Sequence, residues 1–347
     1  MPTRVAINGF GRTGRAFLRS AHERGADLEV VAVNDLTDTA TLAALLARDS
    51  IYGRFPGTVE AGDGAIVVDG REILAPGKPD PADLPWDDLG VDVVIESSGR
   101  FRTRAEAARH IEAGARKVII SAPAKGEEPV DANVVLGVNF DEVYDSERHH
   151  IITNASCTTN CLAPVAKVLH ETVGIRHGQM TTIHAYTSDQ NLQDGPHKDL
   201  RRARAAALNL IPTSTGAAKA LGLIIPELVG RLHGFAVRVP LATGSLVDLT
   251  FESDRATSIE EINATFSERA DTGVLAGILA YSDAPLVSSD IVQSPYSSIF
   301  DAGLTNVVDD TQVKVIAWYD NEWGYSSRLV DLAERVLMPV TAAGGLS

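Results

Sequence analysis

The stretch Val5-Ala6-Ile7-Asn8-Gly9-Phe10-Gly11-Arg12-Thr13-Gly14 decides the fold of the first part of the chain. Its apolar start has the composition of a short buried strand, and the pattern G-x-G-x-x-G follows at once. Residues 15–23 place apolar side chains at helical spacing, and residues 28–34 have the composition of a second buried strand. A strand, a glycine-rich turn, a helix and another strand together predict a βαβ unit whose turn carries a function.

The spacing around this turn is that of a dinucleotide-binding fingerprint. Asp35 follows the second strand, 21 positions after Gly14, where an acidic side chain accepts hydrogen bonds from ribose hydroxyls. We expect Gly9 to permit the tight turn, Gly11 to let a pyrophosphate approach the backbone, and Gly14 to allow close helix–strand packing. Because a carboxylate at position 35 would repel a 2′-phosphate, the sequence predicts NAD rather than NADP. A glycine-rich turn in an ordinary βαβ unit is the alternative, which the complete context disfavours.

Alternation of strands and helices continues beyond this unit. Residues 91–96, 117–121 and 134–139 are apolar runs of strand length, and residues 103–113 form a helical pattern that begins with a Thr-x-x-Glu capping box. Such alternation predicts an α/β fold with a Rossmann-type, doubly wound parallel sheet.

Ligands of doubly wound sheets bind at the carboxyl ends of the strands. Ser98, Gly99 and Ser121 lie at such ends, so we expect them to face the cofactor. Lys78 lies in a proline-rich loop, where it can reach the adenine side of the cofactor or remain a solvated lysine.

The second half of the chain contains mainly strand patterns, with helical patterns at residues 214–228 and from Ser258 onward. This succession predicts an α+β catalytic domain with a mainly antiparallel sheet. We expect an NAD-binding domain over residues 1–155 and a catalytic domain over residues 156–321. A C-terminal helix within residues 322–347 is expected to pack back on the first domain.

Length and charge restrict the class of protein. A chain of 347 residues is long enough for two domains, and it contains no apolar run of membrane-spanning length. The net charge of −15 argues against nucleic acid as the main partner. The N-terminus enters a strand with no signal-peptide pattern, and the two cysteines, one helical turn apart, do not suggest a disulfide. These features predict a cytoplasmic protein without a membrane segment.

Both cysteines lie in the segment Ser156-Cys157-Thr158-Thr159-Asn160-Cys161-Leu162-Ala163-Pro164. A strand-like run precedes this segment and a helical pattern follows it, so Cys157 is expected at a helix N-terminus. Free N–H groups and the helix dipole at that position would lower the pKa of a thiol and favour the reactive thiolate. A buried, inert cysteine is the alternative, but the neighbouring hydroxyl side chains favour a polar pocket.

This segment resembles the active-site signature of phosphorylating glyceraldehyde-3-phosphate dehydrogenases over nine residues without a break. Further segments resemble the same family in order along the chain: His184–Gln190, Asp199–Arg204, Pro212–Lys219, Arg238–Pro240 and Trp318–Tyr325. The resemblance covers nearly the whole chain. It implies an NAD-dependent enzyme that oxidises a phosphorylated aldehyde with inorganic phosphate as co-substrate, and it implies a homotetramer.

The resemblance also implies roles for individual residues. Cys157 would be the nucleophile and His184 the general base. Thr187 and Arg238 would hold the phosphate of the substrate. The attacking phosphate would be held by Ser156, Thr158, Thr215 and Gly216, with Arg202 near it. On the cofactor, Asn321 would fix the nicotinamide carboxamide, and Arg12 and Thr13 would contact the pyrophosphate. The family implies no metal.

The chain departs from the family pattern after Arg238. Members commonly have V-P-T-x-N-V-S, where this chain has Val-Pro-Leu241-Ala-Thr243-Gly244-Ser. Gly244 is expected to loosen the backbone, and the loss of polar groups near Arg238 could slow alkylation of the thiol by substrate-like inhibitors. Neutral drift is the alternative.

Three other functions remain open at this stage. The sister enzyme that acts on erythrose 4-phosphate is disfavoured by Thr187 and by the intact Thr215-Gly216-Ala217-Ala218. An inactive paralogue with a binding role is disfavoured by retention of Cys157, His184 and Arg238. A thiol hydrolase is disfavoured by the dinucleotide fingerprint.

Overall fold

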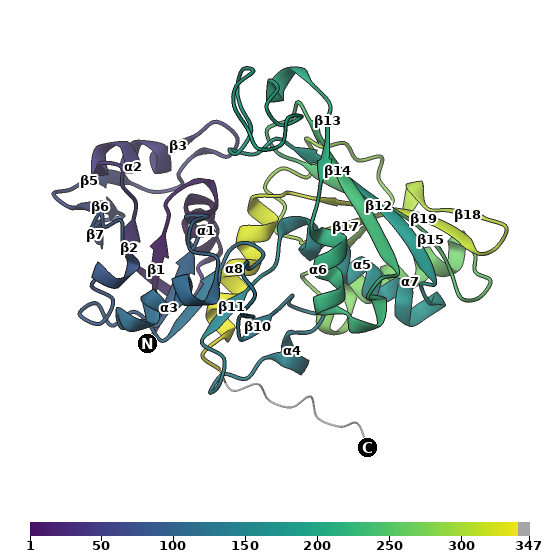
Figure 1. Ribbon diagram of the computed structural model, residues 1–347, viewed down its shortest axis with the longest axis horizontal. Coiled ribbons are helices and arrows are strands. Elements are labelled where there is room, and N and C mark those ends of the chain that lie inside the picture. Colours follow the sequence, from purple (N-terminus) through teal and green to yellow (C-terminus); the bar gives the residue numbers. More distant parts are fainter. Residues whose placement is uncertain (339–347) are drawn as a thin grey trace. The chain divides into compact units, whose positions relative to one another are not determined.

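A computed structural model describes residues 1–338 of the chain (Figure 1). These residues form two units, and the chain passes between them more than once. The first contains Met1–Leu136, Phe140–Ala155 and the described residues from Ser326 onward, and the second contains Gly137–Asn139 and Ser156–Tyr325. No helix within residues 1–338 is long and apolar enough to cross a membrane.

The first unit is built on a nine-stranded sheet of order β10-β11-β9-β8-β1-β2-β7-β6-β5. The strands are β1 (Thr3–Asn8), β2 (Leu28–Asn34), β5 (Val59–Ala61), β6 (Ala65–Val68), β7 (Arg71–Leu74), β8 (Val93–Glu96), β9 (Lys117–Ile120), β10 (Ala132–Asn133) and β11 (Ile151–Thr153). Pairing is parallel from β10 to β7 and antiparallel from β7 to β5. Because β2 lies on one side of β1 and β8 on the other, the order reverses at β1, where doubly wound sheets bind ligands. The predicted parallel sheet is confirmed.

Helices flank the strands of this unit along the chain. They are α1 (Arg12–Arg24), α2 (Thr39–Ala47), α3 (Arg104–Glu112), the short α4 (Phe140–Val143) and α8 (Trp323–Arg335), together with a 3-10 turn at Pro81–Asp83 and a small hairpin of β3 (Arg48–Asp49) and β4 (Gly53–Arg54). The predicted capping box of Thr103 and Glu106 is present at the start of α3. From Ser326 onward α8 belongs to the first unit, where the Ser327 hydroxyl lies 3.1 Å from that of Ser20 on α1. Residues 339–347 of the expected C-terminal segment lie outside the described residues.

The strand predicted at residues 134–139 is wrong. The strand here is β10, which ends at Asn133, and the chain then turns through Gly137 with φ of 75°. A side chain at position 137 would collide with the carbonyl of Val274. The apolar residues after β10 are buried, as the pattern indicated, but burial alone does not distinguish a strand from a packed turn.

The second unit is built on an eight-stranded sheet, seven strands of which follow the order β13-β14-β12-β15-β19-β17-β16, with β18 paired to β19. The strands are β12 (His177–Ala185), β13 (Ile211–Ser214), β14 (Leu232–Val239), β15 (Ser245–Glu252), β16 (Leu279–Ser282), β17 (Ser298–Asp301), β18 (Asn306–Val308) and β19 (Gln312–Tyr319). Only the pairs β12–β14 and β16–β17 are parallel. The prediction of a mainly antiparallel sheet is therefore confirmed.

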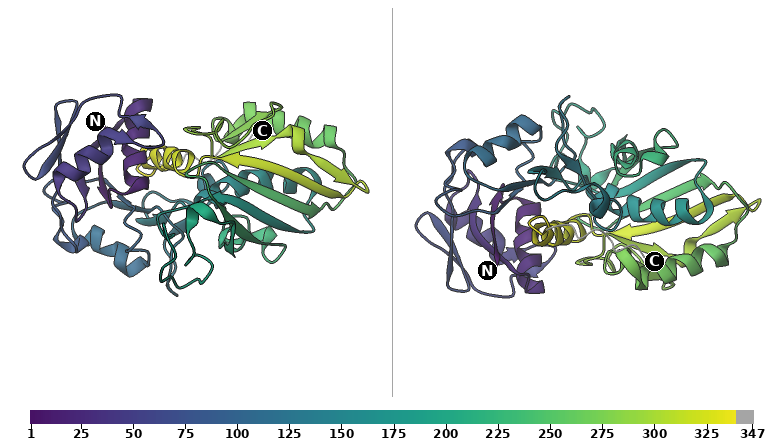
Figure 2. Two further views of the ribbon diagram at one scale, coloured as in Figure 1. Left: turned by 90° about the horizontal axis from the view of Figure 1, so that it is seen from above. Right: turned by 90° about the horizontal axis from the view of Figure 1, so that it is seen from below.

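Helices α5 (Cys157–Val173), α6 (Ala217–Ile224) and α7 (Ile259–Asp271) pack against this sheet, and α5 also packs against the other two (Figures 1 and 2). Every second side chain of β15 is buried, as expected for a strand with one covered face. The helix expected over residues 214–228 is shorter than predicted. Ser214 is the last residue of β13, and Pro226 begins a separate 3-10 turn, because proline cannot continue the hydrogen-bond pattern of α6. Further 3-10 turns are Ala206–Leu208, Pro226–Leu228, Gly273–Leu275 and Ala302–Leu304.

Candidate active site and cofactor pocket

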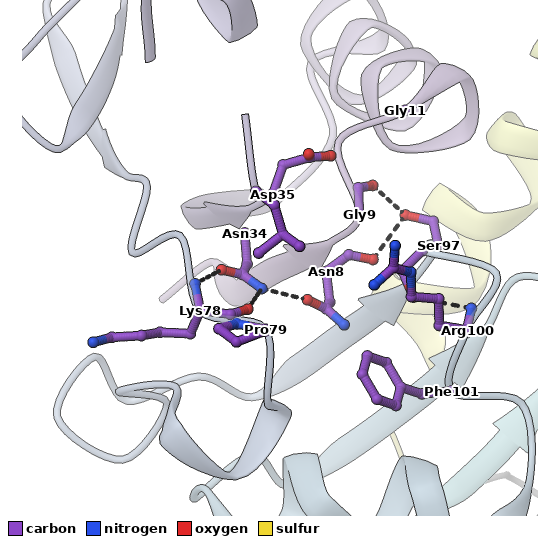
Figure 3. A pocket seen from close by; sticks show the side chains of 12 residues that line it. Asn8, Gly9, Gly11, Asn34, Asp35, Lys78, Pro79, Ser97, Arg100 and Phe101 are labelled. Carbon is purple, nitrogen blue, oxygen red and sulfur yellow. Dashed lines mark hydrogen bonds between the residues drawn. The ribbon is translucent and has the colours of Figure 1, made fainter. Parts of the chain in front are cut away.

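A pocket opens in the first unit at the carboxyl ends of β1, β2 and β8 (Figure 3). Its lining includes five of the predicted cofactor residues, Gly9, Gly11, Asp35, Lys78 and Ser98. It also includes residues that the sequence analysis did not single out: Asn8, Asn34, Leu36, Pro79, Ser97, Arg100 and Phe101. Their signal in the sequence was proximity, since each lies within three positions of a predicted cofactor residue. Because the pocket opens at the end of β1, it lies where the order of the strands reverses, which is the usual place of a dinucleotide site.

Two glycines of the fingerprint are required by the geometry of this turn. Gly9 has φ of 95°, and a Cβ there would overlap the backbone of Ser98. A Cβ on Gly14 would collide with the carbonyl of Gly9 and approach Ile7. Gly9 thus permits the tight turn, and Gly14 permits the close packing of helix and strand, as the pattern predicts.

The side chain of Asp35 is held at the edge of the pocket. Its Oδ2 accepts a hydrogen bond of 3.0 Å from the backbone N–H of Phe10. The carboxylate is thereby fixed next to the glycine-rich turn (Figure 3), where it can receive ribose hydroxyls. Lys78 is exposed, and its side chain extends away from the other labelled residues, which leaves its role as a cofactor contact a prediction.

Four other predicted cofactor contacts, Arg12, Thr13, Gly99 and Ser121, are not among the residues that line this pocket. The guanidinium of Arg12 pairs instead with Asp49 and lies over the ring of Tyr52, 5.5 Å from its centroid. Arg12 and Thr13 are the first residues of α1, whose N-cap, Gly11, provides no side-chain hydrogen bond. They can therefore offer an anion the backbone N–H groups of a helix N-terminus.

In the second unit, Cys157 and His184 lie side by side. Cys157 is the first residue of α5, and His184 is the last but one residue of β12. The Sγ of Cys157 lies 3.4 Å from Nε2 of His184. The other ring nitrogen, Nδ1, lies 2.6 Å from the carbonyl oxygen of Ala185. Nη1 of Arg238 also lies 3.0 Å from Nδ1, but its two hydrogens have acceptors in the Ala185 carbonyl and the Thr187 hydroxyl. Because the nearer carbonyl of Ala185 only accepts, Nδ1 carries the hydrogen and the lone pair of Nε2 faces the thiol. The imidazole is thus oriented as a base toward Cys157.

Burial dominates the electrostatics of this pair. Burial raises the pKa of the Cys157 thiol, while the charge of Arg238 and hydrogen bonds from Thr158 act in the opposite direction. Burial, and then the charge of Arg238, lower the pKa of His184 to about 3. The backbone N–H groups at the helix start lower the thiol pKa, as expected, but the net prediction of a lowered pKa is wrong because desolvation is the larger effect. A neutral thiol faces a neutral imidazole that can accept its proton.

Strand pairing places Arg238 next to this pair. The parallel register of β12 and β14 sets Arg238 directly opposite His184. Its Nη1 donates to the carbonyl of Ala185 and to the hydroxyl of Thr187, each at 3.0 Å. Within residues 1–338, the buried Nε of Arg238 has no hydrogen-bond partner. A guanidinium with an unfilled buried donor, next to a threonine hydroxyl, fits an anionic group of a ligand.

Two neighbours of Thr187 were missed by the sequence analysis. Asp189 binds the hydroxyl of Thr187 and, at 2.6 Å, Nη1 of Arg202. Gln190 accepts a hydrogen bond from the N–H of Thr187, and its buried Nε2 has no partner in the part of the chain that the structure describes. Both belong to the segment that carried the resemblance to the dehydrogenase family, and this was the only available signal.

A second group of donors surrounds the start of α6. Nη2 of Arg202 donates to the carbonyl of Ser214 at 3.4 Å, and Thr215 is the next residue after Ser214. The hydroxyl of Thr215 accepts from the N–H of Ala217, and Gly216 is the N-cap with no side-chain hydrogen bond. A cation and a helix start thus lie close together, as an inorganic phosphate would require.

The hydroxyls at the start of α5 already have partners. Ser156 caps the helix by accepting from the N–H of Thr159 at 3.1 Å. The Thr158 hydroxyl is buried and lies 2.8 Å from that of Tyr319, which also contacts Thr182. Thr158 is therefore better placed to offer an anion its backbone N–H than its hydroxyl.

The amide of Asn321 is held by a serine hydroxyl. The Ser245 Oγ accepts from the N–H of Ala185 at 3.1 Å and donates to Oδ1 of Asn321 at 2.9 Å. This arrangement leaves the Nδ2 group of Asn321 as the donor available to a carboxamide oxygen.

The backbone geometry explains one residue of the departure after Arg238, which is Gly244 in place of the valine common in the family. Gly244 has φ of 89°, and a Cβ there would meet the carbonyl of Ser288, so a valine would be strained and would clash. The expectation that Gly244 loosens the backbone is wrong, since the position is tightly packed. Thr243 is buried and donates to Asp320 at 3.0 Å, whereas Leu241 is exposed. Nothing in the structure explains leucine at position 241.

A dinucleotide pocket in one unit and a cysteine–histidine pair beside an arginine in the other fit the class of NAD-dependent oxidoreductases. Within residues 1–338 no group of three or more His, Cys, Asp or Glu side chains is placed to hold a metal. Residues 3–104 match the family profile described as the NAD binding domain of glyceraldehyde 3-phosphate dehydrogenase, and residues 156–321 match the profile of its C-terminal domain. The chain belongs to the glyceraldehyde 3-phosphate dehydrogenase family, which confirms the resemblance.

Individual relatives agree over almost their full length. The chain is 62% identical to glyceraldehyde-3-phosphate dehydrogenase 2 of Streptomyces arenae over 333 residues, covering 96% of this chain and 98% of that protein. It is 62% identical to the glyceraldehyde-3-phosphate dehydrogenase of Mycobacterium tuberculosis over 342 residues, and 60% identical to that of Mycolicibacterium smegmatis over 343 residues. Each of these two matches covers 97% of this chain and 99% of the relative.

Proposed function

We propose that this protein oxidises glyceraldehyde 3-phosphate, with NAD and inorganic phosphate, to 1,3-bisphosphoglycerate. The contact between Cys157 Sγ and His184 Nε2, with Arg238 opposite His184, is the observation that supports it best. The names of the relatives agree with this reaction.

Cys157 and His184 divide the covalent chemistry between them. His184 accepts the proton of the thiol as the sulfur attacks the aldehyde carbon and returns it to the alkoxide that forms, which gives a neutral imidazole and a hemithioacetal. The imidazole then takes the proton of the hemithioacetal hydroxyl, while the hydride leaves the same carbon. NAD held by the pocket of the first unit would supply the acceptor for that hydride. The product is a thioester on Cys157, which inorganic phosphate attacks, and the thiolate leaves as the acyl phosphate forms.

Two separate groups of donors serve the two phosphates in this proposal. Arg238 and Thr187 hold the phosphate of the substrate, which keeps the aldehyde next to the sulfur. Arg202, Thr215 and Gly216 hold the attacking phosphate, which they receive at the start of α6. Because Asp189 pairs with Arg202, phosphate binding must displace or share that contact.

The residues of the first unit fit NAD. Asp35 stands where ribose hydroxyls are recognised, the position next to Gly11 is open, and the start of α1 offers N–H groups to a pyrophosphate. Asn321, which belongs to the second unit, would donate from Nδ2 to the nicotinamide carboxamide.

The test is NADH formation from glyceraldehyde 3-phosphate with and without phosphate. With phosphate we expect steady turnover. Without phosphate we expect one rapid equivalent of NADH for each Cys157, followed by slow thioester hydrolysis. Erythrose 4-phosphate serves as the competing substrate, and faster turnover of it would contradict the assignment, as would a steady rate that does not depend on phosphate.

We further propose that the protein is a homotetramer in the cytoplasm. Four leucines of residues 187–210 are 70% to 84% exposed in a single chain, namely Leu192, Leu200, Leu208 and Leu210, and apolar exposure of this extent favours coverage by another subunit. A reactive thiol is preserved best in a reducing compartment. Light scattering should give about four times the chain mass of 36.9 kDa, whereas a monomer would contradict the proposal.

A further inference from the structure

Behind the cofactor pocket lies a buried polar cluster that the chemistry above does not use. It consists of Asn8 at the end of β1, Glu96 at the end of β8, His110 on α3 and Trp86, each no more than 2% exposed. A buried carboxylate is costly unless it is paired and hydrogen-bonded. Within residues 1–338 no lysine or arginine pairs with Glu96, and His110, whose Nε2 lies 3.1 Å from Oε2, would form an ion pair only when protonated. The hydrogen bonds must therefore account for its presence.

Trp86 fixes the hydrogen of His110. The indole Nε1 lies 3.0 Å from His110 Nδ1, and an indole N–H can only donate. Nδ1 is therefore the acceptor, and the hydrogen of the ring is on Nε2. That nitrogen lies 3.1 Å from Oε2 of Glu96, so His110 donates to the carboxylate.

The backbone of Lys78 fixes the opposite end of the cluster. Its N–H donates to Asn34 Oδ1 and its carbonyl accepts from Asn34 Nδ2, both at 2.8 Å, so the amide of Asn34 cannot be reversed (Figure 3). The same Nδ2 donates to Oδ1 of Asn8 at 2.8 Å. The amide of Asn8 is thereby oriented, and its Nδ2 donates to Glu96 Oε2 at 2.5 Å.

The other carboxylate oxygen of Glu96, Oε1, also accepts every hydrogen bond that it makes. The N–H and the hydroxyl of Ser98 reach Oε1 at 2.9 and 2.5 Å, and the Ser98 hydroxyl accepts in turn from the N–H of Arg100. Four donors thus converge on the two oxygens of Glu96. Only a carboxylate, which accepts and does not donate, satisfies all four, because the NH₂ group of a glutamine would face another donor.

We infer that Glu96 is a positioning residue for the cofactor, which orders two walls of the pocket before NAD binds. One branch of its hydrogen bonds holds the turn at Ser98, and the other reaches the backbone of Lys78 through Asn8 and Asn34. Both walls line the pocket. The inference rests on the cofactor pocket proposed above. Ordering the walls in advance lowers the entropy that binding costs, so Glu96 acts on affinity for NAD rather than on the chemistry at Cys157.

The test compares Glu96→Gln with Glu29→Gln, a matched control whose carboxylate pairs with Arg4 at the surface of the same unit. NAD affinity is measured by calorimetry on the full-length protein, and hydrogen exchange of the Lys78 and Ser98 amides is followed without NAD. For Glu96→Gln we expect the Kd for NAD to rise about tenfold or more and both amides to exchange faster. Alkylation of Cys157 by iodoacetamide should keep its rate, and the control should match the wild type throughout.

Wild-type affinity and wild-type exchange in a folded Glu96→Gln variant would overturn the inference. If that variant does not fold, Asn8→Ala provides the decision, because it cuts the branch between Glu96 and Asn34 and leaves the direct contact of Asn34 with the Lys78 amide. The Lys78 amide should then exchange faster while the Ser98 amide keeps its protection, and unchanged exchange at Lys78 would overturn the inference. Asp35→Ala separates this question from the pocket assignment itself. If Asp35→Ala binds NAD normally the pocket assignment fails, and if only Glu96→Gln binds normally just the present inference fails.

Discussion

The two cysteines of this protein lie one helical turn apart on α5, yet their surroundings differ. Cys157 begins the helix, with His184 Nε2 at 3.4 Å and the charge of Arg238 acting on its thiol. Cys161 is completely buried, and its Sγ lies 3.6 Å from the Ser298 hydroxyl. Burial raises the pKa of Cys161 to about 12, with no cation to oppose it.

Burial raises the thiol pKa at both positions, and backbone N–H groups at the helix start oppose this only at Cys157. A further difference is that the carboxyl ends of β12 and β14 bring a base and a cation to Cys157, whereas Cys161 meets only core atoms. A thiol on a helix thus becomes reactive through groups supplied by neighbouring strands. The following predictions test that conclusion, in order of decreasing effect.

Cys157→Ser should have the largest effect. The hydroxyl of serine is a far weaker acid than a thiol, so His184 cannot generate the nucleophile, and we expect kcat to fall by about 10⁴-fold or more. Steady-state NADH formation measures the loss, and calorimetry should show that NAD still binds. A variant with activity within tenfold of the wild type would refute the assignment of the nucleophile.

His184→Asn should reduce kcat by about 10²–10⁴-fold, the usual contribution of a general base. The variant retains a polar side chain but cannot take up the protons of the thiol and the hemithioacetal. Stopped-flow measurement of the first equivalent of NADH isolates this step from product release. An unchanged rate of that first equivalent would show that His184 is not the base.

Arg238→Gln should weaken both the binding of the substrate phosphate and the stabilisation of the Cys157 thiolate. We expect kcat/KM for glyceraldehyde 3-phosphate to fall by about 10²-fold, because a charge-assisted contact to phosphate is lost. The rate at which iodoacetamide alkylates Cys157 should also fall, since the positive charge that favours the thiolate is removed. Arg204→Gln, which changes an exposed arginine of the same unit, is the control. A faster alkylation in Arg238→Gln would contradict this account.

The buried imidazole should also make the protein sensitive to acid. The pKa of His184 is about 3 in the folded chain, below the ordinary value of about 6.5 for an unfolded one. Below pH 6.5 the unfolded state therefore binds the proton first, and stability falls as the pH decreases toward 3. This single group contributes a slope of up to about 1.4 kcal/mol per pH unit in that window. Denaturant unfolding at several pH values should show a shallower decline for His184→Asn, and equal declines would contradict the shifted pKa.

Cys161→Ser should have the smallest effect. The new hydroxyl finds possible partners in Ser298 and the carbonyl of Ala317, so we expect a loss of about 1–2 kcal/mol in the free energy of unfolding. Activity should remain within about twofold of the wild type, because Cys161 touches no group of the site. A Cys161→Ser variant that is folded and inactive would reverse the roles assigned to the two cysteines.

Several features could be predicted from the sequence because they depend on neighbouring residues. The strand Leu28–Asn34 has the predicted bounds, and the capping box at Thr103 is present. The glycine-rich turn could also be interpreted from its spacing, since Gly9 and Gly14 are needed by the local backbone and its closest packing. Cys157 begins a helix as predicted, because Ser156 is a good N-cap residue.

Local patterns were insufficient where packing decides between alternatives. The apolar run at residues 134–139 is buried but forms a turn, and the helix expected from Ser214 is reduced to α6 by a strand before it and a proline after it. The thiol pKa was predicted in the wrong direction because the sequence shows the helix start but not the depth of burial.

The sequence by itself therefore determined the βαβ unit, the cofactor fingerprint and the place of Cys157 at a helix start, since each rests on a continuous stretch of chain. Only the tertiary structure decided that His184 faces Cys157, 27 residues away, and that Glu96 receives donors from Asn8 and His110. These contacts follow from the register of non-adjacent strands and from helices packed across them. Pairing of this kind joins positions far apart in the chain, and no local pattern of residues specifies it.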